Sequence, residues 1–339
     1  DTDGVADDMR ALSLAVMHPD AEVLAITTVH GCVGADQATA NVLRLQRAAG
    51  LEKKLFPIYK GASEAIIRKP FEVVKFFGVD GIGDCPDVSP KVLPTDFTVR
   101  EGDSAAMTLL RLTKEHGDVT IVCLGPLTNI ALAYKLDPKF STRIKKLVIL
   151  GGNHYGVGNV DEFSSAEFNF HDDPEAAKIV IEEMDTDTIL VPWENVYFKG
   201  PEYEKLVDFE AHLKVGTPLA TFLSHATRIC REICRKCGNQ LSYCDEIAVA
   251  IATDERIAKK AVDLRISIEL HGQMTRHESG QVVVDWHGLM YNNDETLTEK
   301  PLAKRVDYSR RKVHVIFEYD VKTLDQWMHN AMLGRKTPW

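Results

Sequence analysis

The chain has 339 residues, of which 45% are hydrophobic and 27% are charged, a composition that can fill a large globular core. It carries 50 acidic and 40 basic residues, and the resulting net charge of -10 argues against a nucleic-acid polymer or an anionic membrane as partner. No apolar run approaches the roughly 20 residues that a membrane-spanning helix requires.

Apolar strands and amphipathic helices alternate along the first half of the chain. Continuous apolar runs predict strands at 21–29, 55–61, 119–125, 145–152 and 187–193, and helical spacing predicts helices at 35–50, 104–117, 126–136 and 173–184. Strands of this kind must be covered on both faces. The pattern therefore predicts an α/β fold, with a mainly parallel open sheet and helices on both of its faces.

The second half is organised differently. Residues 201–260 are expected to be largely helical, and strands are expected at 265–272, 281–286 and 312–320 before a closing helix. Longer loops are expected at 62–103, 153–172 and 272–312. With no repeat, low-complexity segment or linker, we expect residues 1–339 to form one domain.

The seven cysteines are odd in number and unevenly spaced, and the chain has no Asn-x-Ser/Thr sequon. This pattern predicts reduced thiols and a cytoplasmic location. Cys230, Cys234 and Cys237 have the spacing of one helical face. A zinc site would require a turn geometry and a histidine at suitable spacing, so we favour a helix with small buried thiols.

Four carboxylates, Asp1, Asp3, Asp7 and Asp8, open the chain. Carboxylates this close raise one another's pKa unless solvent or a cation relieves the repulsion. One interpretation is a solvated loop, with Asp7 and Asp8 favoured by the N-terminus of a following helix. The other is a site for a hard divalent cation. Composition alone leaves both open.

The opening DTDGV also resembles the first motif of haloacid-dehalogenase-type phosphatases, with Asp1 as nucleophile and Asp3 as acid and base. That interpretation leaves Asp7 and Asp8 without a role. It also requires an acidic pair late in the chain, and GIGDCPD at 81–87 comes too early. We keep it as a minor alternative.

The opening DTDGVADD resembles the DxDxxxDD motif of the inosine–uridine-preferring nucleoside hydrolase family. Further segments that resemble the family follow in its order: CLGPLTNIALA (123–133), ILGG (149–152), AEFNF (166–170), DPEAA (173–177), DEIAVA (245–250) and GQMTRHESGQVVVDW (272–286). The resemblance implies the nucleoside hydrolase fold, a bound Ca²⁺, and hydrolysis of ribonucleosides to free base and ribose. It further implies an oxocarbenium-like transition state, a metal-bound water as nucleophile, and a homodimer or homotetramer.

The resemblance also assigns roles to individual residues. Asp3 matches the general base, which is at the same time a metal ligand. The other implied metal ligands are Asp8, Asp245 and the carbonyl oxygen of Leu124. The implied ribose-binding residues are Asp7, Asn159, Glu167, Asn169 and Asp245. Asp1 matches a residue that supports the ligands, and we expect Asn129 to organise the start of a helix.

Two departures from the family pattern are informative. Members usually have a strand leading into DxDxxxDD, so we expect a strand upstream of Asp1. Cys244 stands where many members have a histidine that protonates the leaving base, and the chain resembles a subgroup with cysteine there. A thiol, with an ordinary pKa near 8.5, is a weaker proton donor at neutral pH than imidazole.

The leaving-group region is therefore assigned to Cys244 and Tyr243, with His154, Tyr155 and Trp193 as further candidates by residue type. The same substitution motivates a second hypothesis from another class. In it, the protein is a metal-dependent ribose or nucleoside binder with weak or no catalysis.

Overall fold

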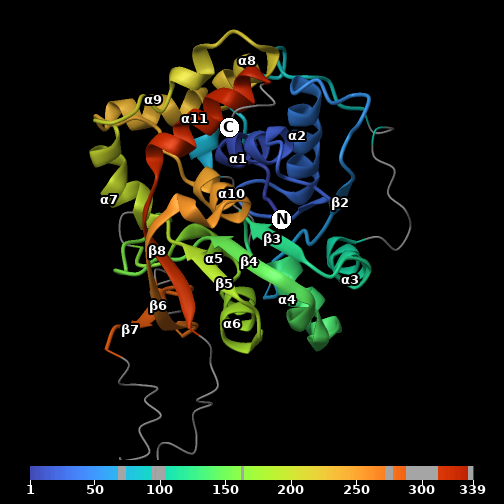
Figure 1. Ribbon diagram of the computed structural model, residues 1–339, viewed down its shortest axis with the longest axis vertical. Coiled ribbons are helices and arrows are strands. Elements are labelled where there is room, and N and C mark those ends of the chain that lie inside the picture. Colours follow the sequence, from blue (N-terminus) through green and yellow to red (C-terminus); the bar gives the residue numbers. More distant parts are fainter. Residues whose placement is uncertain are drawn as a thin grey trace, which may run out of the picture.

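A six-stranded sheet forms the centre of the molecule (Figure 1). The computed structural model describes residues 1–67, 74–93, 96, 104–161, 164–271, 278–287, 312–334 and 339. The strand order is β3–β4–β5–β8–β6–β7. The strands are β3 (Val119–Cys123), β4 (Ile144–Leu150), β5 (Thr188–Val191), β6 (Ala258–Ile268), β7 (Val282–Asp285) and β8 (Val313–Tyr319). The first four in this order are parallel, while β6 and β7 are antiparallel to their neighbours.

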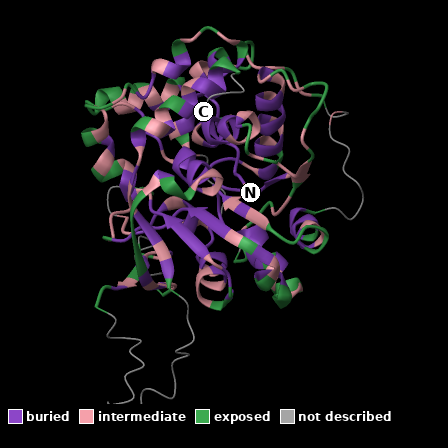
Figure 2. Ribbon diagram, in the orientation of Figure 1, coloured by how far each residue is buried: buried purple, intermediate pink, exposed green. Residues whose placement is uncertain are grey.

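Helices cover both faces of this sheet, as predicted. One face packs against α3 (Ala105–Glu115), α4 (Thr128–Leu136) and α6 (Pro174–Glu183). The other packs against α1 (Ala6–Met17), α10 (Asp245–Thr253) and α11 (Val321–Leu333). Strands β4 and β5 are mostly buried between the two layers, whereas the first half of β6 is exposed (Figure 2).

Strand β4 shows why its sequence is a continuous apolar run. Leu147 and Ile149 belong to the core under α4 and α6, whereas Val148 and Leu150 belong to the core under α1 and α10. Successive side chains of a strand point to opposite faces, so a strand covered on both sides needs apolar residues at every position.

A two-stranded parallel sheet lies beside the main one. It consists of β1 (Ile26–Thr28) and β2 (Ile58–Lys60). A separate core joins it to α2 (Ala35–Ala48), α8 (Pro218–Ala226) and α9 (Arg228–Lys236). The remaining helices are α5 (Phe168–Asp172), α7 (Glu194–Tyr203) and the short 3₁₀ segments Lys75–Phe77, Pro138–Arg143, Ala211–Lys214 and Glu255–Ile257.

The first two residues connect the two sheets. The Asp1 nitrogen donates to the Val122 carbonyl at 2.7 Å, and the Leu124 nitrogen donates to the Asp1 carbonyl at 2.9 Å. Thr2 pairs with the other sheet, donating to Thr27 and accepting from Val29, both at 3.0 Å. The start of the chain is thereby fixed between β1 and β3.

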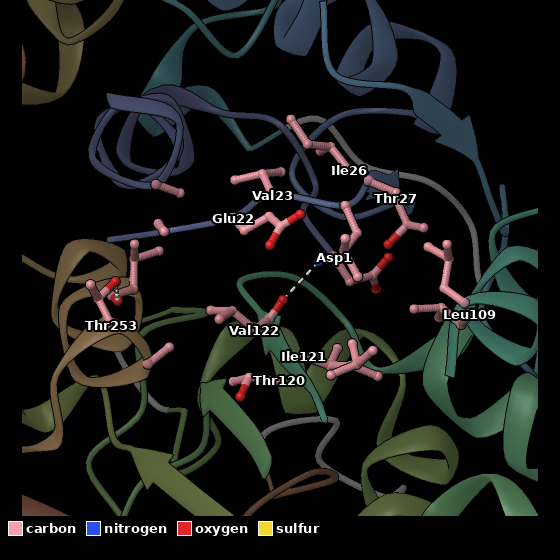
Figure 3. Close-up of a pocket in the computed structure, with 18 of the residues that line it drawn as sticks. Asp1, Glu22, Val23, Ile26, Thr27, Leu109, Thr120, Ile121, Val122 and Thr253 are labelled. Carbon is pink, nitrogen blue, oxygen red and sulfur yellow. Dashed lines mark hydrogen bonds between the residues drawn. The ribbon is translucent and has the colours of Figure 1, made fainter. Parts of the chain in front are cut away.

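A groove of about 440 Å³ lies next to Asp1, between the segment that contains β1 and the segment that contains β3 (Figure 3). Residues 20–27 line one side of it and residues 118–122 the other. Of the predicted site residues, only Asp1 and Leu124 line this groove. We therefore do not assign the groove to the substrate.

Several boundaries differ from the predictions. The strand expected at 21–29 is paired with β2 only at Ile26–Thr28, and the residues before it border the groove without a partner strand. The helical stretch expected to reach residue 260 ends at Thr253, and β6 starts at Ala258. Residues 272–277, part of the closing segment, lie outside the described residues.

The cysteine helix exists as α9, but only Cys230 is buried there. Cys234 is half-buried and Cys237, just past the helix, is exposed, so the expectation of three buried thiols is wrong for these two. Within the described part of the chain, no helix is both long and apolar enough to cross a membrane.

Candidate active site

Two helix N-termini bring the predicted acidic residues together. Asp7 and Asp8 lie in the first turn of α1, and Asp3 lies in the turn before it. Asp245 is the first residue of α10, which packs against α1. The partial positive charge at a helix N-terminus favours carboxylates at both places. The exposed fractions of Asp3, Asp8 and Asp245 are only 2%, 1% and 2%, so these carboxylates are nearly inaccessible.

Hydrogen bonds fix the orientation of two of these carboxylates. Asp3 Oδ2 accepts from the Cys32 nitrogen at 2.7 Å. Asp8 accepts from the Thr2 hydroxyl and, at 3.2 Å, from the Val5 nitrogen. Sequence reasoning gave Thr2 no role, because a threonine between two aspartates carries no distinctive pattern.

Two glycines make this arrangement possible. A side chain at Gly31 would place its Cβ 2.3 Å from Asp3 Oδ2, so only glycine leaves room for the carboxylate. Gly4 has a φ of +70° and would place a Cβ 2.6 Å from the Ala38 backbone. This conformation, which favours glycine, lets the chain turn from Asp3 into α1.

Burial and mutual repulsion raise the pKa of each carboxylate. Burial raises the pKa of Asp3 to about 6, although hydrogen bonds from Asp8 and Cys32 oppose the shift. The pKa of Asp8 is raised well above its usual range by burial and then by the charge of Asp3. The pKa of Asp245 is also raised strongly, by burial and then by Asp7 and Asp8. No positively charged group is among the largest influences on the pKa values of Asp3, Asp8 and Asp245.

The cluster fits a hard divalent cation. Asp245 Oδ2 is buried and has no hydrogen-bond partner, which is costly unless something else satisfies it. Its neighbours offer carboxylate oxygens, the ligands that Ca²⁺ prefers. The Leu124 carbonyl accepts from Asn169 Nδ2 at 3.0 Å and retains a second lone pair. Asp3, Asp8, Asp245 and Leu124 remain the ligands that the resemblance implies, but in the described structure the group whose ligand atoms all lie within 4.8 Å of one another is Asp7, Cys244 and Asp245.

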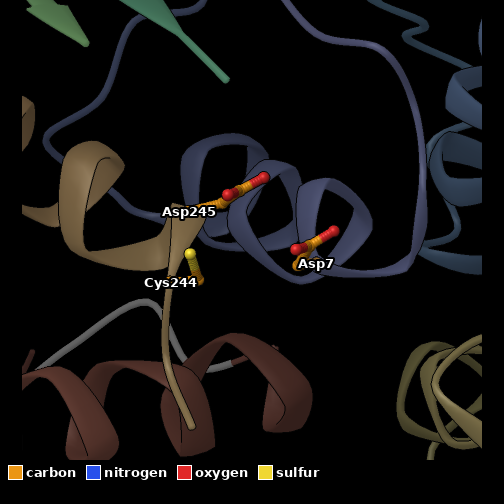
Figure 4. Close-up of side chains that lie close together, drawn as sticks. All are labelled: Asp7, Cys244 and Asp245. Atoms are coloured by element: carbon orange, nitrogen blue, oxygen red, sulfur yellow. The ribbon is translucent and has the colours of Figure 1, made fainter. Parts of the chain in front are cut away.

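Cys244 borders the same cluster. Its sulfur and carboxylate oxygens of Asp7 and Asp245 lie within 4.8 Å of one another, and Figure 4 shows the three side chains together. Burial and then the nearby carboxylates, Asp245 first, raise the pKa of the Cys244 thiol well above its usual range. The thiol is therefore neutral near pH 7. Among the described residues this is the only such group of three, and it does not include the α9 cysteines.

Glu167 and Asn169 lie at the carboxyl ends of β3 and β4. Glu167 caps α5, accepting from the nitrogens of Asn169 at 2.8 Å and Gly152 at 2.7 Å. Burial raises the pKa of Glu167 to about 7. Asn169 Nδ2 donates to the carbonyls of Leu124 and, at 3.3 Å, Leu150. These contacts place both side chains where a ligand binds in parallel α/β sheets.

Asn159 lies nearer the protein surface than Glu167 and Asn169. Its side chain is exposed, and its Oδ1 accepts from the Phe168 nitrogen at 2.7 Å. It is thus tied to the start of α5, next to Glu167.

The remaining leaving-group candidates differ in environment. Tyr243 is fully buried, and its hydroxyl donates to Asp325 on α11 at 2.7 Å. His154 Nδ1 lies 2.6 Å from Glu194, and Trp193 donates to the Val157 carbonyl at 2.7 Å. Tyr155 is exposed and stacks on Trp286, outside the carboxylate cluster. Of the cysteine and histidine candidates, Cys244 is the one that forms a close group with the carboxylates of Asp7 and Asp245 in the described structure.

Asn129, the second residue of α4, was expected to organise the start of that helix, and the structure shows it joining three segments at the base of the site. Its Nδ2 donates to Asp1 Oδ1 at 2.7 Å and to the Thr28 carbonyl at 3.0 Å, and its Oδ1 accepts from the Ala62 nitrogen at 2.9 Å. Asp1 is thereby held beside the cluster by both main chain and side chain.

Comparison with known proteins agrees with the arrangement of these residues. The family model described as inosine-uridine preferring nucleoside hydrolase matches residues 1–326. The chain belongs to this family. Because the match starts at the acidic motif, it favours the nucleoside hydrolase interpretation of that motif over the phosphatase one.

Individual relatives extend the comparison. Uridine nucleosidase 1 of Arabidopsis thaliana is 41% identical over 182 residues, which are 53% of this chain and 51% of the relative. The chain thus spans about half the length of that relative. An inosine-uridine preferring nucleoside hydrolase of Leishmania major is 30% identical, covering 84% of this chain and 86% of that one. Among solved structures, an inosine-guanosine nucleoside hydrolase superposes with a TM-score of 0.79 at 26% identity, covering 98% and 97% of the two chains.

Proposed function

We propose that the protein hydrolyses the N-glycosidic bond of ribonucleosides, releasing free base and ribose, and that it depends on Ca²⁺. Family membership supports the reaction class. The observation that carries the proposal is the group of buried carboxylates, in which Asp245 Oδ2 has no hydrogen-bond partner. Such a group is suited both to a cation and to a substrate that becomes positive as it reacts.

The cation would be held by carboxylate oxygens of Asp3, Asp8 and Asp245 and by the Leu124 carbonyl. When bound, Ca²⁺ would offset the repulsion among the carboxylates, orient the ribose hydroxyls and lower the pKa of a nearby water. In this proposal Asp3 accepts the proton of the attacking water. The hydrogen bond from the Cys32 nitrogen keeps the Asp3 carboxylate in a single orientation.

The other side chains act on the ribose. Asp7, Glu167, Asn169, Asn159 and Asp245 would bind its hydroxyl groups. Departure of the base leaves positive charge on the ribosyl ring, in an oxocarbenium-like transition state. Carboxylates around the ring stabilise that charge more than they stabilise the neutral substrate, so they lower the barrier.

Cys244 lies in the leaving-group region of this proposal. Its raised pKa keeps the thiol protonated, so it can donate a hydrogen bond but is a weak acid. Tyr243 would contribute only by position, because its hydroxyl binds Asp325. We also propose, from the family resemblance, a homodimer or homotetramer, which sedimentation would test.

The variant Asp3→Asn tests the proposed reaction. We expect kcat for ribose release from a panel of purine and pyrimidine nucleosides to fall about 10²–10⁴-fold, the usual contribution of a general base. Circular dichroism should show an intact fold, since asparagine has the same shape. Asp36→Asn, which changes an exposed aspartate paired with Lys60, is the control and should retain full activity. Undiminished turnover by Asp3→Asn would contradict the assignment.

A second candidate function is nucleoside or ribose binding with little catalysis. The observation that favours it is Cys244, a neutral thiol where a stronger acid would help the base to leave. It predicts calorimetric binding of ribose in the presence of Ca²⁺ without release of base. Robust turnover of any nucleoside would exclude it.

A further inference from the structure

A buried ion pair lies directly behind the carboxylate cluster. Arg10, one helical turn after Asp7 on α1, places its Nε 2.7 Å from Oε1 of Glu246, the second residue of α10. The exposed fractions of the two side chains are 1% and 0%. The charges of the pair cancel, so it adds no net charge to the site.

Each member of the pair also binds the segment that leads into α10. Arg10 Nη1 donates to the Leu241 carbonyl at 3.3 Å, and its guanidinium lies 5.0 Å from the centre of the Tyr243 ring. Glu246 Oε2 accepts from the Cys244 nitrogen at 2.8 Å. Residues 241–246, which carry Cys244 and Asp245, are therefore fastened to the helix that carries Asp7 and Asp8.

Stability alone does not explain such a pair. Removing two charges from water costs about as much as their attraction returns, and apolar or neutral replacements of buried pairs are often neutral in stability. An arginine with its fixed fork geometry does, however, impose a defined distance and orientation on its partners. Two helices joined in this way cannot slide without breaking the pair.

We infer that Arg10 and Glu246 are positioning residues that set the separation between the carboxylates of α1 and Asp245, and thereby the affinity of the site for its cation. This inference rests on the proposed cation site. The inference goes beyond that site because Arg10 and Glu246 are proposed as ligands of neither the cation nor the substrate. Outer residues that orient metal ligands commonly act in this way.

The test uses the double variant Arg10→Met with Glu246→Gln in the full chain. It removes both charges together, so no buried charge is left unpaired, and glutamine keeps an acceptor for the Cys244 nitrogen. Cation affinity is measured by calorimetry with Ca²⁺ and by luminescence with Tb³⁺, and folding by thermal unfolding without a cation. We expect a Kd raised about 10–100-fold with the unfolding midpoint little changed.

A matched control comes from another ion pair. Arg231 Nη1 lies 3.2 Å from Glu210 Oε2, with exposed fractions of 12% and 7%; Glu210 is also paired with Arg235, and none of the three is a proposed ligand. The variant Arg231→Met with Glu210→Gln should leave the Kd for Ca²⁺ unchanged. Equal losses of affinity in both double variants would show a general effect of removing ion pairs and would overturn the inference.

The single variant Glu246→Gln is a second test that changes only one side chain. It keeps the shape of the side chain and one acceptor oxygen, which can serve the Cys244 nitrogen, but it removes the charge that pairs with Arg10. We expect a rise of the Kd in the same direction, and thermal unfolding shows whether the variant is folded. A folded variant of either kind with wild-type Ca²⁺ affinity would overturn the positioning role alone. Wild-type protein that binds neither Ca²⁺ nor Tb³⁺ would overturn the cation site, and this inference with it.

Discussion

At the scale of single residues, the active-site carboxylates oppose folding. A carboxyl group whose pKa is higher in the folded chain binds more protons when folded than when unfolded. For Asp3 this holds between the ordinary aspartate pKa of 3.8 and about 6. The free energy of unfolding must therefore fall as pH rises through this window, and a cation that neutralises the cluster must restore it.

This linkage gives a prediction for thermal unfolding. Ca²⁺ should raise the unfolding temperature of the wild-type protein more at about pH 7.5 than at about pH 5, because protons compete with the cation for the carboxylates at the lower pH. Differential scanning calorimetry with Ca²⁺ and with chelator would measure the effect. The Asp3→Asn variant should show a smaller Ca²⁺ shift and a weaker pH dependence without cation. A Ca²⁺ shift that grew toward low pH would contradict the raised pKa values.

The residue scale also shows what the sequence was able to predict. The acidic motif and the AEFN segment predicted Asp3, Asp8, Glu167 and Asn169 as site residues; the fold places Glu167 and Asn169 at the strand ends and Asp8 in the first turn of α1. The sequence also led us to group Tyr243 with Cys244, because the two residues are adjacent in the chain. Successive side chains of an extended segment point in different directions, and the Tyr243 hydroxyl binds α11 instead.

The pair of Arg10 and Glu246 was missed altogether. Its only signal in the sequence is a single arginine within the mainly apolar stretch MRALSLAVM and a glutamate next to Asp245 at the start of DEIAVAIA. Periodicity indicates that such charges lie on helices, but it does not indicate that two helices more than 200 residues apart are neighbours.

At the scale of elements, a five-residue helix depends on a single carboxylate. Glu167 accepts from the first nitrogens of α5 and also from Gly152 after β4. Short helices are marginal without capping, so the cap and the packing together determine whether α5 forms. Asn169 is oriented by this same helix.

We therefore expect Glu167→Ala to cost roughly 2–4 kcal/mol of unfolding free energy, because it leaves buried N–H groups without an acceptor. Ser104→Ala provides the comparison, since Ser104 caps α3 through one nitrogen at an exposed helix end. That change should cost only about 1 kcal/mol. Urea unfolding of both variants measures the difference. Equal losses of unfolding free energy in the two variants would mean that Glu167 contributes no more than an ordinary exposed helix cap.

Element boundaries were predicted well where local pattern decides them. The helix expected at 35–50 is α2 at 35–48, and the strand expected at 145–152 is β4 at 144–150. The strand expected at 21–29 contained the right residues, but only three of them find a partner strand. Pairing is a property of the whole sheet and is not encoded in the strand's own residues.

At the scale of the whole molecule, Asn129 joins the two sheets. It bonds Asp1, which pairs with β3, as well as Thr28 of β1 and Ala62 beyond β2. The side chain is only 1% exposed, so water does not replace these contacts when it is removed.

Asn129→Ala should accordingly destabilise the protein by roughly 2–4 kcal/mol, since the Ala62 nitrogen and Asp1 Oδ1 lose their partner, whereas the Thr28 carbonyl still accepts from the Gly61 nitrogen. We expect it also to weaken Ca²⁺ binding, because Asp1 loses the contact that holds it beside Asp3. Chemical unfolding and calorimetry measure the two effects. Asn239→Ala, at an exposed position after α9, is the control and should change neither. A stability equal to that of wild type would show that Asn129 does not hold the sheets together.

The pairing of Asp1 and Thr2 with both sheets has a further consequence for the order of events in folding. Thr2 contacts Thr27, a local partner, but Asp1 pairs with Val122 and Leu124, and Asp245 joins the cluster from still farther along the chain. Contacts across such separations close large loops and form slowly. During refolding, the carboxylates should therefore remain apart until most of the chain is in place, and a competent cation site would mark the completion of folding.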